Sequence, residues 1–148
     1  MDKKIINKDT GELCFDNGFV VSKNTTLEEL LRHFGKDKIT KSEYNRNVYI
    51  LQQQKLGKYY LKFYFYFGKQ HLNKIEFEVE TKPIERIPWS SNRDVETRWI
   101  ARQLDDKSNF KWDMNKAGRH YHLQYDWGSI GVYYDFKNGT FSSVLVYK

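Results

Sequence analysis

The sequence is poor in the features on which several protein classes depend. It has a single cysteine, Cys14, so no disulfide can form within the chain. Only 2 prolines are present, which disfavours long irregular segments. No apolar run is long enough to span a bilayer. The first residues are basic but no apolar stretch follows them, so we expect no secretory signal and a cytoplasmic location.

The sequence also lacks the short motifs of common catalytic sites. It contains no glycine-rich phosphate loop and no paired-cysteine metal motif. His120 and His122 would share one strand face. A zinc site needs a third or fourth ligand, which Asp126 or His71 would have to supply. Cys14 has no oxyanion-type turn beside it and is expected to pack as a small apolar residue. We therefore predict no catalytic residue, no metal and no cofactor, with a small metal-dependent enzyme as an alternative.

The net charge of +6 is spread along the chain. Residues 1–80 carry 14 Lys and Arg against 11 Asp and Glu, and residues 81–148 carry 11 against 8. Nucleic-acid-binding proteins usually concentrate their cations in one patch or stripe. The even distribution instead indicates a soluble surface with mild attraction to acidic partners.

Aromatic residues are abundant, at 17% of the chain, and one segment concentrates them. Residues 59–67 read Tyr-Tyr-Leu-Lys-Phe-Tyr-Phe-Tyr-Phe. Side chains alternate across a strand, so this segment predicts a strand with two different faces. One face is apolar and is expected to form the floor under a helix at 27–34; it consists of Leu61, Phe63, Phe65 and Phe67. The other face carries Tyr60, Lys62, Tyr64 and Tyr66.

The outward tyrosines admit three interpretations. Another layer of the chain covers them, or they bind a protein, or they stack on nucleic-acid bases. A predicted return strand at 72–80 would place glutamates beside them, including Glu76 and Glu78. These carboxylates would repel phosphates, so protein binding ranks first, structural cover second and nucleic acid third.

Capping and turn signals define the other elements of residues 1–82. Thr26 and Glu29 form a capping box for a helix at 27–34, which Gly35 ends. The remaining predicted elements are strands at 13–15 and 19–21, a loop at 36–47 and a strand at 48–51.

Residues 83–88 interrupt the pattern and separate a first half, 1–82, from a second half, 89–148. Ser90-Ser91-Asn92 predicts the N-cap of a second helix reaching residue 104. Strands are then predicted at 110–114, 119–125, 129–136 and 140–147. Each half is a helix followed by an antiparallel meander. This order predicts one compact α+β domain, residues 1–148, with two helices on one face of antiparallel sheet and two pseudo-repeated halves.

The second half offers three further candidates for the outer surface. Tyr133 and Asp135 share a strand face and would extend that surface if the sheet is continuous between the halves. Trp127 lies in a predicted turn, where it would cap the turn or serve as an exposed anchor.

Two helix-then-meander halves with outward tyrosines resemble the tandem layout of β-lactamase-inhibitor-like proteins. They are also similar to small bacterial immunity proteins that neutralise polymorphic or contact-dependent toxins. The resemblance rests on residues 19–35, which lead into strands ending at Glu80, and on residues 92–147. It implies a protein-binding inhibitor whose sheet face blocks a toxin or an enzyme, with no membrane partner. The expected partner-binding residues are Tyr60, Lys62, Tyr64, Tyr66, Glu76, Glu78, Trp127, Tyr133 and Asp135; a nucleic-acid-binding module is the alternative.

Overall fold

The computed structural model describes residues 4–16, 18–45, 47–69, 71–81, 89–105, 119–135 and 140–148. For residues 89–94, 119–121, 134–135 and 140 it describes the backbone. The elements, in chain order, are β1 (Leu13–Cys14), β2 (Val20–Val21), α1 (Leu27–Phe34), β3 (Ile39–Lys41), β4 (Val48–Leu56), β5 (Tyr59–Phe67), β6 (Leu72–Glu80), α2 (Trp89–Gln103), β7 (Arg119–Tyr125), β8 (Gly128–Asp135) and β9 (Thr140–Tyr147).

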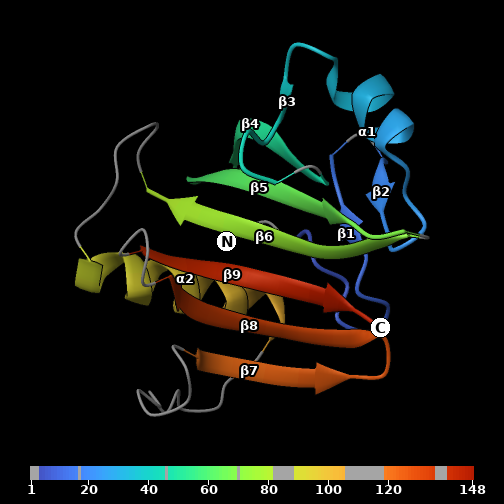
Figure 1. Ribbon diagram of the computed structural model, residues 1–148. Coiled ribbons are helices and arrows are strands. Elements are labelled where there is room, and N and C mark those ends of the chain that lie inside the picture. Colours follow the sequence, from blue (N-terminus) through green and yellow to red (C-terminus); the bar gives the residue numbers. More distant parts are fainter. Residues whose placement is uncertain are drawn as a thin grey trace.

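A seven-stranded antiparallel sheet forms the centre of the molecule, and its strand order is β3-β4-β5-β6-β9-β8-β7 (Figure 1). Strands β1 and β2 form a separate two-stranded sheet. The pairing of β6 with β9 joins the strands of the first half to those of the second, so one sheet crosses the boundary between them. The α+β class with antiparallel sheet, predicted from the sequence, is confirmed.

Helix α1 begins and ends where its capping residues predict. The Thr26 hydroxyl accepts a hydrogen bond from the Glu29 N–H at 3.1 Å, and the Glu29 carboxylate accepts one from the Thr26 N–H at 3.2 Å. Gly35 follows the last turn with φ 97°, and its N–H donates to the Leu31 carbonyl. Leu30 is fully buried, so the apolar stripe of the helix faces the core.

Several boundaries differ from the prediction. The segment 36–47, expected to be a loop, contains β3, whose Ile39 pairs with Leu51. Strand β4 continues past Leu51 to Leu56 through a bulge before Gln54. Helix α2 begins at Trp89, ahead of the predicted N-cap at 90–92. The strand predicted at 110–114 lies outside the described residues.

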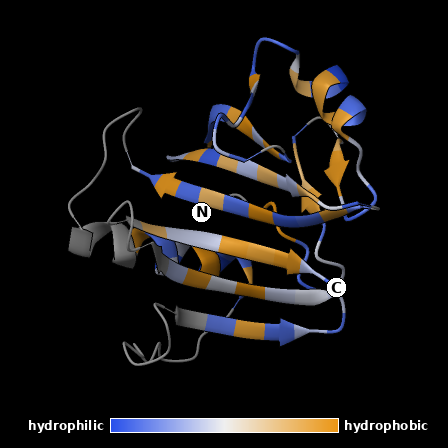
Figure 2. Cartoon of the chain, in the orientation of Figure 1, coloured by the Kyte–Doolittle hydropathy of each residue, from blue (hydrophilic) through white to orange (hydrophobic). Residues whose placement is uncertain are grey.

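The core lies between one face of the sheet and the two helices. Strands β5 and β6 alternate as their sequences predict, which Figure 2 shows as alternating hydropathy along β6. Phe77 of β6 makes an edge-to-face contact with Trp99 of α2, at a ring distance of 5.7 Å. Phe63 of β5 contacts Phe15 at 5.6 Å, and Phe15 contacts Phe34 of α1 at 5.2 Å. Phe15 therefore separates α1 from the apolar floor on which that helix was expected to lie.

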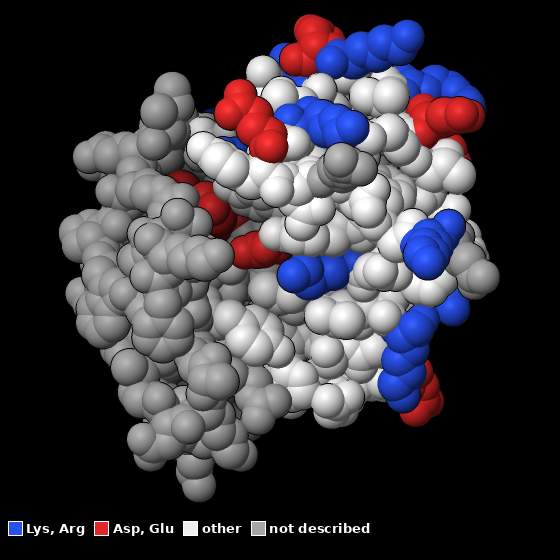
Figure 3. Space-filling view, viewed as in Figure 1, with Lys and Arg blue, Asp and Glu red and all other residues white. Residues whose placement is uncertain are grey.

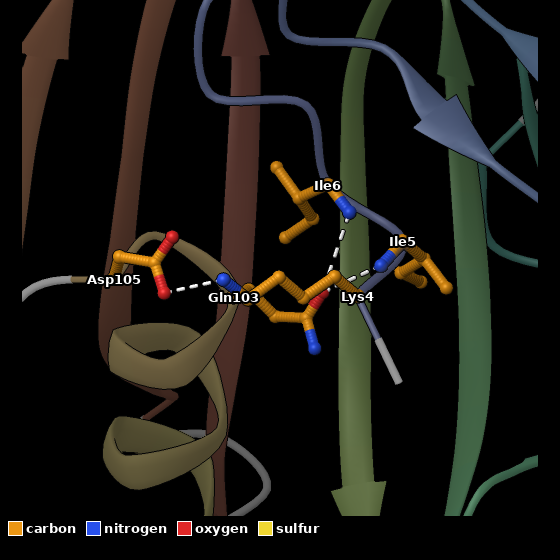
Figure 4. A network of polar contacts seen from close by, with 5 residues as sticks. All are labelled: Lys4, Ile5, Ile6, Gln103 and Asp105. Atoms are coloured by element: carbon orange, nitrogen blue, oxygen red, sulfur yellow. Dashed lines mark hydrogen bonds and ion pairs between the residues drawn. The ribbon is translucent and has the colours of Figure 1, made fainter. Parts of the chain in front are cut away.

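The N-terminal segment is bound by the side chains of Gln103, in α2, and Asp105 (Figure 4). The Gln103 side-chain oxygen accepts hydrogen bonds from the Ile5 N–H at 2.7 Å and the Ile6 N–H at 3.3 Å. Lys4 forms an ion pair with Asp105, just beyond the helix. Ile5 and Ile6 are buried, so this segment forms part of the core. Neither described helix combines the length and apolar character needed to cross a membrane.

Candidate protein-binding face

The sheet face opposite α2, called the outer face here, carries the predicted tyrosine row. Tyr60, Tyr64 and Tyr66 alternate with fully buried residues of β5 and are partly exposed. Both helices and the β1–β2 hairpin lie on the other face, so no described helix covers the outer face (Figure 1). By register, the outer face includes Val48, Ile50, Lys55, Tyr60, Lys62, Tyr64, Tyr66, Lys74, Glu76, Glu78, Glu80, Ser142, Val144, Val146, Tyr133, Ser129, His122 and Gln124.

Glutamates of β6 hold the tyrosine rings in place. The Tyr64 hydroxyl donates to the Glu78 carboxylate at 3.1 Å, and the Tyr66 hydroxyl donates to the Glu76 carboxylate at 2.7 Å. Glu76 also accepts a hydrogen bond from the Ser142 hydroxyl at 2.8 Å. Both bonds from tyrosine are diagonal, since Tyr64 lies directly opposite Glu76 in the register. The rings are thus ordered before any partner arrives, which lowers the entropy cost of binding.

Lysines lie against the same rings. The Lys74 Nζ lies 4.0 Å from the Tyr66 ring centroid, and the Lys62 Nζ lies 5.3 Å from the Tyr64 ring centroid. Both distances are within the range of cation–π attraction. The Nζ of Lys55, on β4, lies 5.9 Å from the Tyr60 ring centroid. The outer face therefore combines aromatic area with cations and hydrogen-bonded carboxylates.

The outer face continues across the seam between β6 and β9 into the second half. Tyr133 of β8 pairs with Ser142 of β9, and its ring lies 6.5 Å from that of His122 on β7. Asp135 pairs with Thr140 and so shares the outer register with Tyr133; its side chain is not described. Sequence reasoning treated His122 as half of a metal pair and did not place it on this face.

The structure does not bring Trp127 together with the tyrosine row. Its indole N–H donates to the Lys8 carbonyl at 2.8 Å, and its ring stacks on Tyr125 at 5.2 Å. A Cβ added at Gly11 would lie 2.5 Å from the same ring. The Tyr147 hydroxyl, whose pKa is raised by burial, donates to the Gly11 carbonyl. Trp127 thus fixes the N-terminal loop against the end of the sheet, where it borders an open cleft of about 400 Å³.

The residues considered as metal ligands or catalytic groups do not lie together in the described part of the chain. No three of its His, Cys, Asp and Glu side chains are placed to hold a metal ion. His71 lies in the β5–β6 connection, with Nδ1 2.9 Å from the Leu72 carbonyl oxygen. Cys14 lies in β1, and its N–H donates to the Ile5 carbonyl. The side chain of His120 is outside the description.

A buried carboxyl that sequence reasoning missed lies where β6 and β9 separate. Their ladder ends at Phe77 and Ser143. There, Glu96 of α2 accepts a hydrogen bond from the Val79 N–H at 2.6 Å and one from the Ser143 hydroxyl. Complete burial raises the pKa of Glu96 well above its ordinary value of 4.5. Glu96 lies three residues before buried Trp99 and seven before Gln103, so its place in a helical stripe of buried residues was the available signal.

Comparisons with protein-family models, with curated proteins and with solved structures find no match for this chain. The resemblance to β-lactamase-inhibitor-like and immunity proteins therefore stays a prediction. What is known of the site comes from the chain's own residues.

Proposed function

We propose that this protein binds another protein through its outer face and inhibits that protein by covering its functional surface. The observation that carries the proposal is the row of Tyr60, Tyr64 and Tyr66, which is partly exposed and ordered by its own neighbours. Tyrosine supplies large rigid contact area with one polar tip and is enriched among residues that dominate binding energy. The expected partner is a toxin or an enzyme, as in an immunity protein.

A flat sheet face suits occlusion better than chemistry. The outer face extends over β5, β6, β9 and β8, and the two described clefts are lined mostly by other segments, with Lys55 bordering one of them. Small-molecule sites are usually concave and enclose most of their ligand. A broad face with aromatic residues is instead typical of a contact with a macromolecule.

The test starts from the proteins encoded beside this chain's gene. Each is expressed and assayed for toxicity or enzymatic activity with increasing amounts of the purified protein. We expect one of them to be inhibited in proportion to complex formed. A Tyr64→Ala, Tyr66→Ala variant should lose this inhibition while retaining its circular dichroism spectrum.

Tyr44→Ala is the matched control, because Tyr44 is 97% exposed and lies outside the sheet in the β3–β4 connection. It removes a tyrosine of the same size from a different surface and should inhibit as well as the wild type. A folded double variant that inhibits at full strength would refute the proposal.

A further inference from the structure

The charged groups of the outer face differ in how the fold uses them. Glu76 and Glu78 accept hydrogen bonds from tyrosine hydroxyls, as described above. Lys62 and Lys74 lie over tyrosine rings instead. Lys62 is directly opposite Glu78 in the register, yet among the described residues neither lysine forms an ion pair. Within the described part of the chain, the two carboxylates accept hydrogen bonds, whereas the two ammonium groups contact ring faces.

This difference matters for recognition. An ammonium group has three N–H donors, and a ring face stabilises its charge without accepting hydrogen bonds along a lone pair. The donors of Lys62 and Lys74 are therefore available to acceptors on an incoming surface. The ring contacts also restrict the two ammonium groups, so less side-chain entropy is lost when their donors are engaged.

The charges are also ordered along the strands. On β6, Lys74 lies at one end, and Glu76, Glu78 and Glu80 follow at alternate positions toward the other end. In Figure 3 the surface over the sheet is mostly uncharged, and a carboxylate lies beside the cationic group at its centre. A partner must therefore match a face on which Lys62 and Lys74 lie beside the tyrosine row and next to the carboxylates of β6.

We propose that the partner's contact surface is acidic where it meets Lys62 and Lys74, with carboxylates that bind these two ammonium groups beside the Tyr64 and Tyr66 rings. This inference rests on the proposed function and specifies the chemistry of the protein that the outer face recognises. A carboxylate-bearing protein fits better than a nucleic acid, because a phosphate backbone carries charge at every nucleotide and would also meet Glu76 and Glu78.

The experiment follows backbone amide signals of the isotope-labelled protein by NMR during titration, at low ionic strength, with a diglutamate probe, a capped glycine-rich peptide that carries two glutamates separated by neutral residues. We expect the largest changes at the β5 and β6 amides around Lys62 and Lys74. The Lys62→Gln, Lys74→Gln variant should bind the peptide about fivefold more weakly, the size expected for two exposed ion pairs. Lys36→Gln, Lys41→Gln is the matched control, since both lysines are exposed and lie away from the outer face.

Three results would overturn the inference. The diglutamate probe could cause no change at β5 and β6, the control variant could weaken binding as much as the outer-face variant, or a short single-stranded oligonucleotide of equal charge could bind these strands more tightly than the diglutamate probe. None of these results decides whether the tyrosine row binds a protein. That question is answered separately by the inhibition lost in Tyr64→Ala, Tyr66→Ala, so the two failures are distinguishable.

Discussion

Replacing Glu96 with glutamine is expected to stabilise the protein at neutral and alkaline pH. Burial raises the pKa of this carboxyl, and the charges of Glu78 and Glu80 raise it further, while hydrogen bonds from Ser143 and from the Val79 N–H oppose the increase. The folded state therefore binds a proton that the unfolded state releases above pH 4.5. Stability consequently falls as the pH rises from this value to the raised pKa.

The size of the effect follows from the linkage of one proton to folding. Each pH unit in that interval lowers the free energy of unfolding by up to about 1.4 kcal/mol. Glutamine at position 96 would keep the bond from the Val79 N–H, through its carbonyl, and could donate its amide to the Ser143 hydroxyl. Because glutamine carries no titratable charge, position 96 should no longer contribute to the pH dependence of the free energy of unfolding.

The assay is urea unfolding of wild type and Glu96→Gln at intervals from about pH 5 to about pH 9. The two free energies should be similar at the acid end and diverge as the pH rises, with the variant more stable. Glu43→Gln is the control: Glu43 is exposed, and the variant should follow the wild type within about 0.5 kcal/mol. Parallel curves for wild type and Glu96→Gln would refute the reasoning, because Glu96 would then bind no extra proton in the folded state.

Two further predictions concern the N-terminal segment. Gly11→Ala should lower stability by about 2 kcal/mol or more, because φ is +77° and the new Cβ would lie 2.5 Å from the Trp127 ring. Gly18→Ala, at φ +84° with nothing within 4 Å, should cost only the backbone strain of about 1 kcal/mol, and urea unfolding would compare the two. Gln103→Ala removes the acceptor of the Ile5 N–H and should cost about 1–3 kcal/mol and accelerate hydrogen exchange at that amide. Gln103→Glu retains an acceptor and should preserve more of the amide's protection; equal exchange in wild type and Gln103→Ala would contradict this account of the segment.

The sequence predicted those elements whose signals are local. Strands β5 and β6 alternate over most of their length, so their ranges and most of their faces could be predicted from period two, whereas the register shift between Tyr66 and Phe67 could not. Helix α1 had a complete capping box. Strand β3 was missed because Ile39 is isolated among polar residues, and its pairing with Leu51 depends on a chain reversal that the sequence does not encode locally.

In the candidate site, too, the features with local signals were predictable and those that depend on tertiary contacts were not. Alternation placed the tyrosine row on the outer face, but the register that joins Tyr64 to Glu78 is a tertiary property. Glu96 was assigned no functional role from the sequence, whereas the fold buries it where β6 and β9 separate. Trp127 was open to two interpretations, and its bond to Lys8, far away in sequence, favours the structural one.

The central claim is that the tyrosine row supplies the binding energy for a protein partner. Its most direct test is the dissociation constant of the complex for wild type, Tyr66→Ala and Tyr44→Ala, measured by calorimetry. We predict that Tyr66→Ala weakens binding by about 2 kcal/mol, or roughly thirtyfold, and that Tyr44→Ala leaves it unchanged. Equal affinities for wild type and a correctly folded Tyr66→Ala protein would contradict the account.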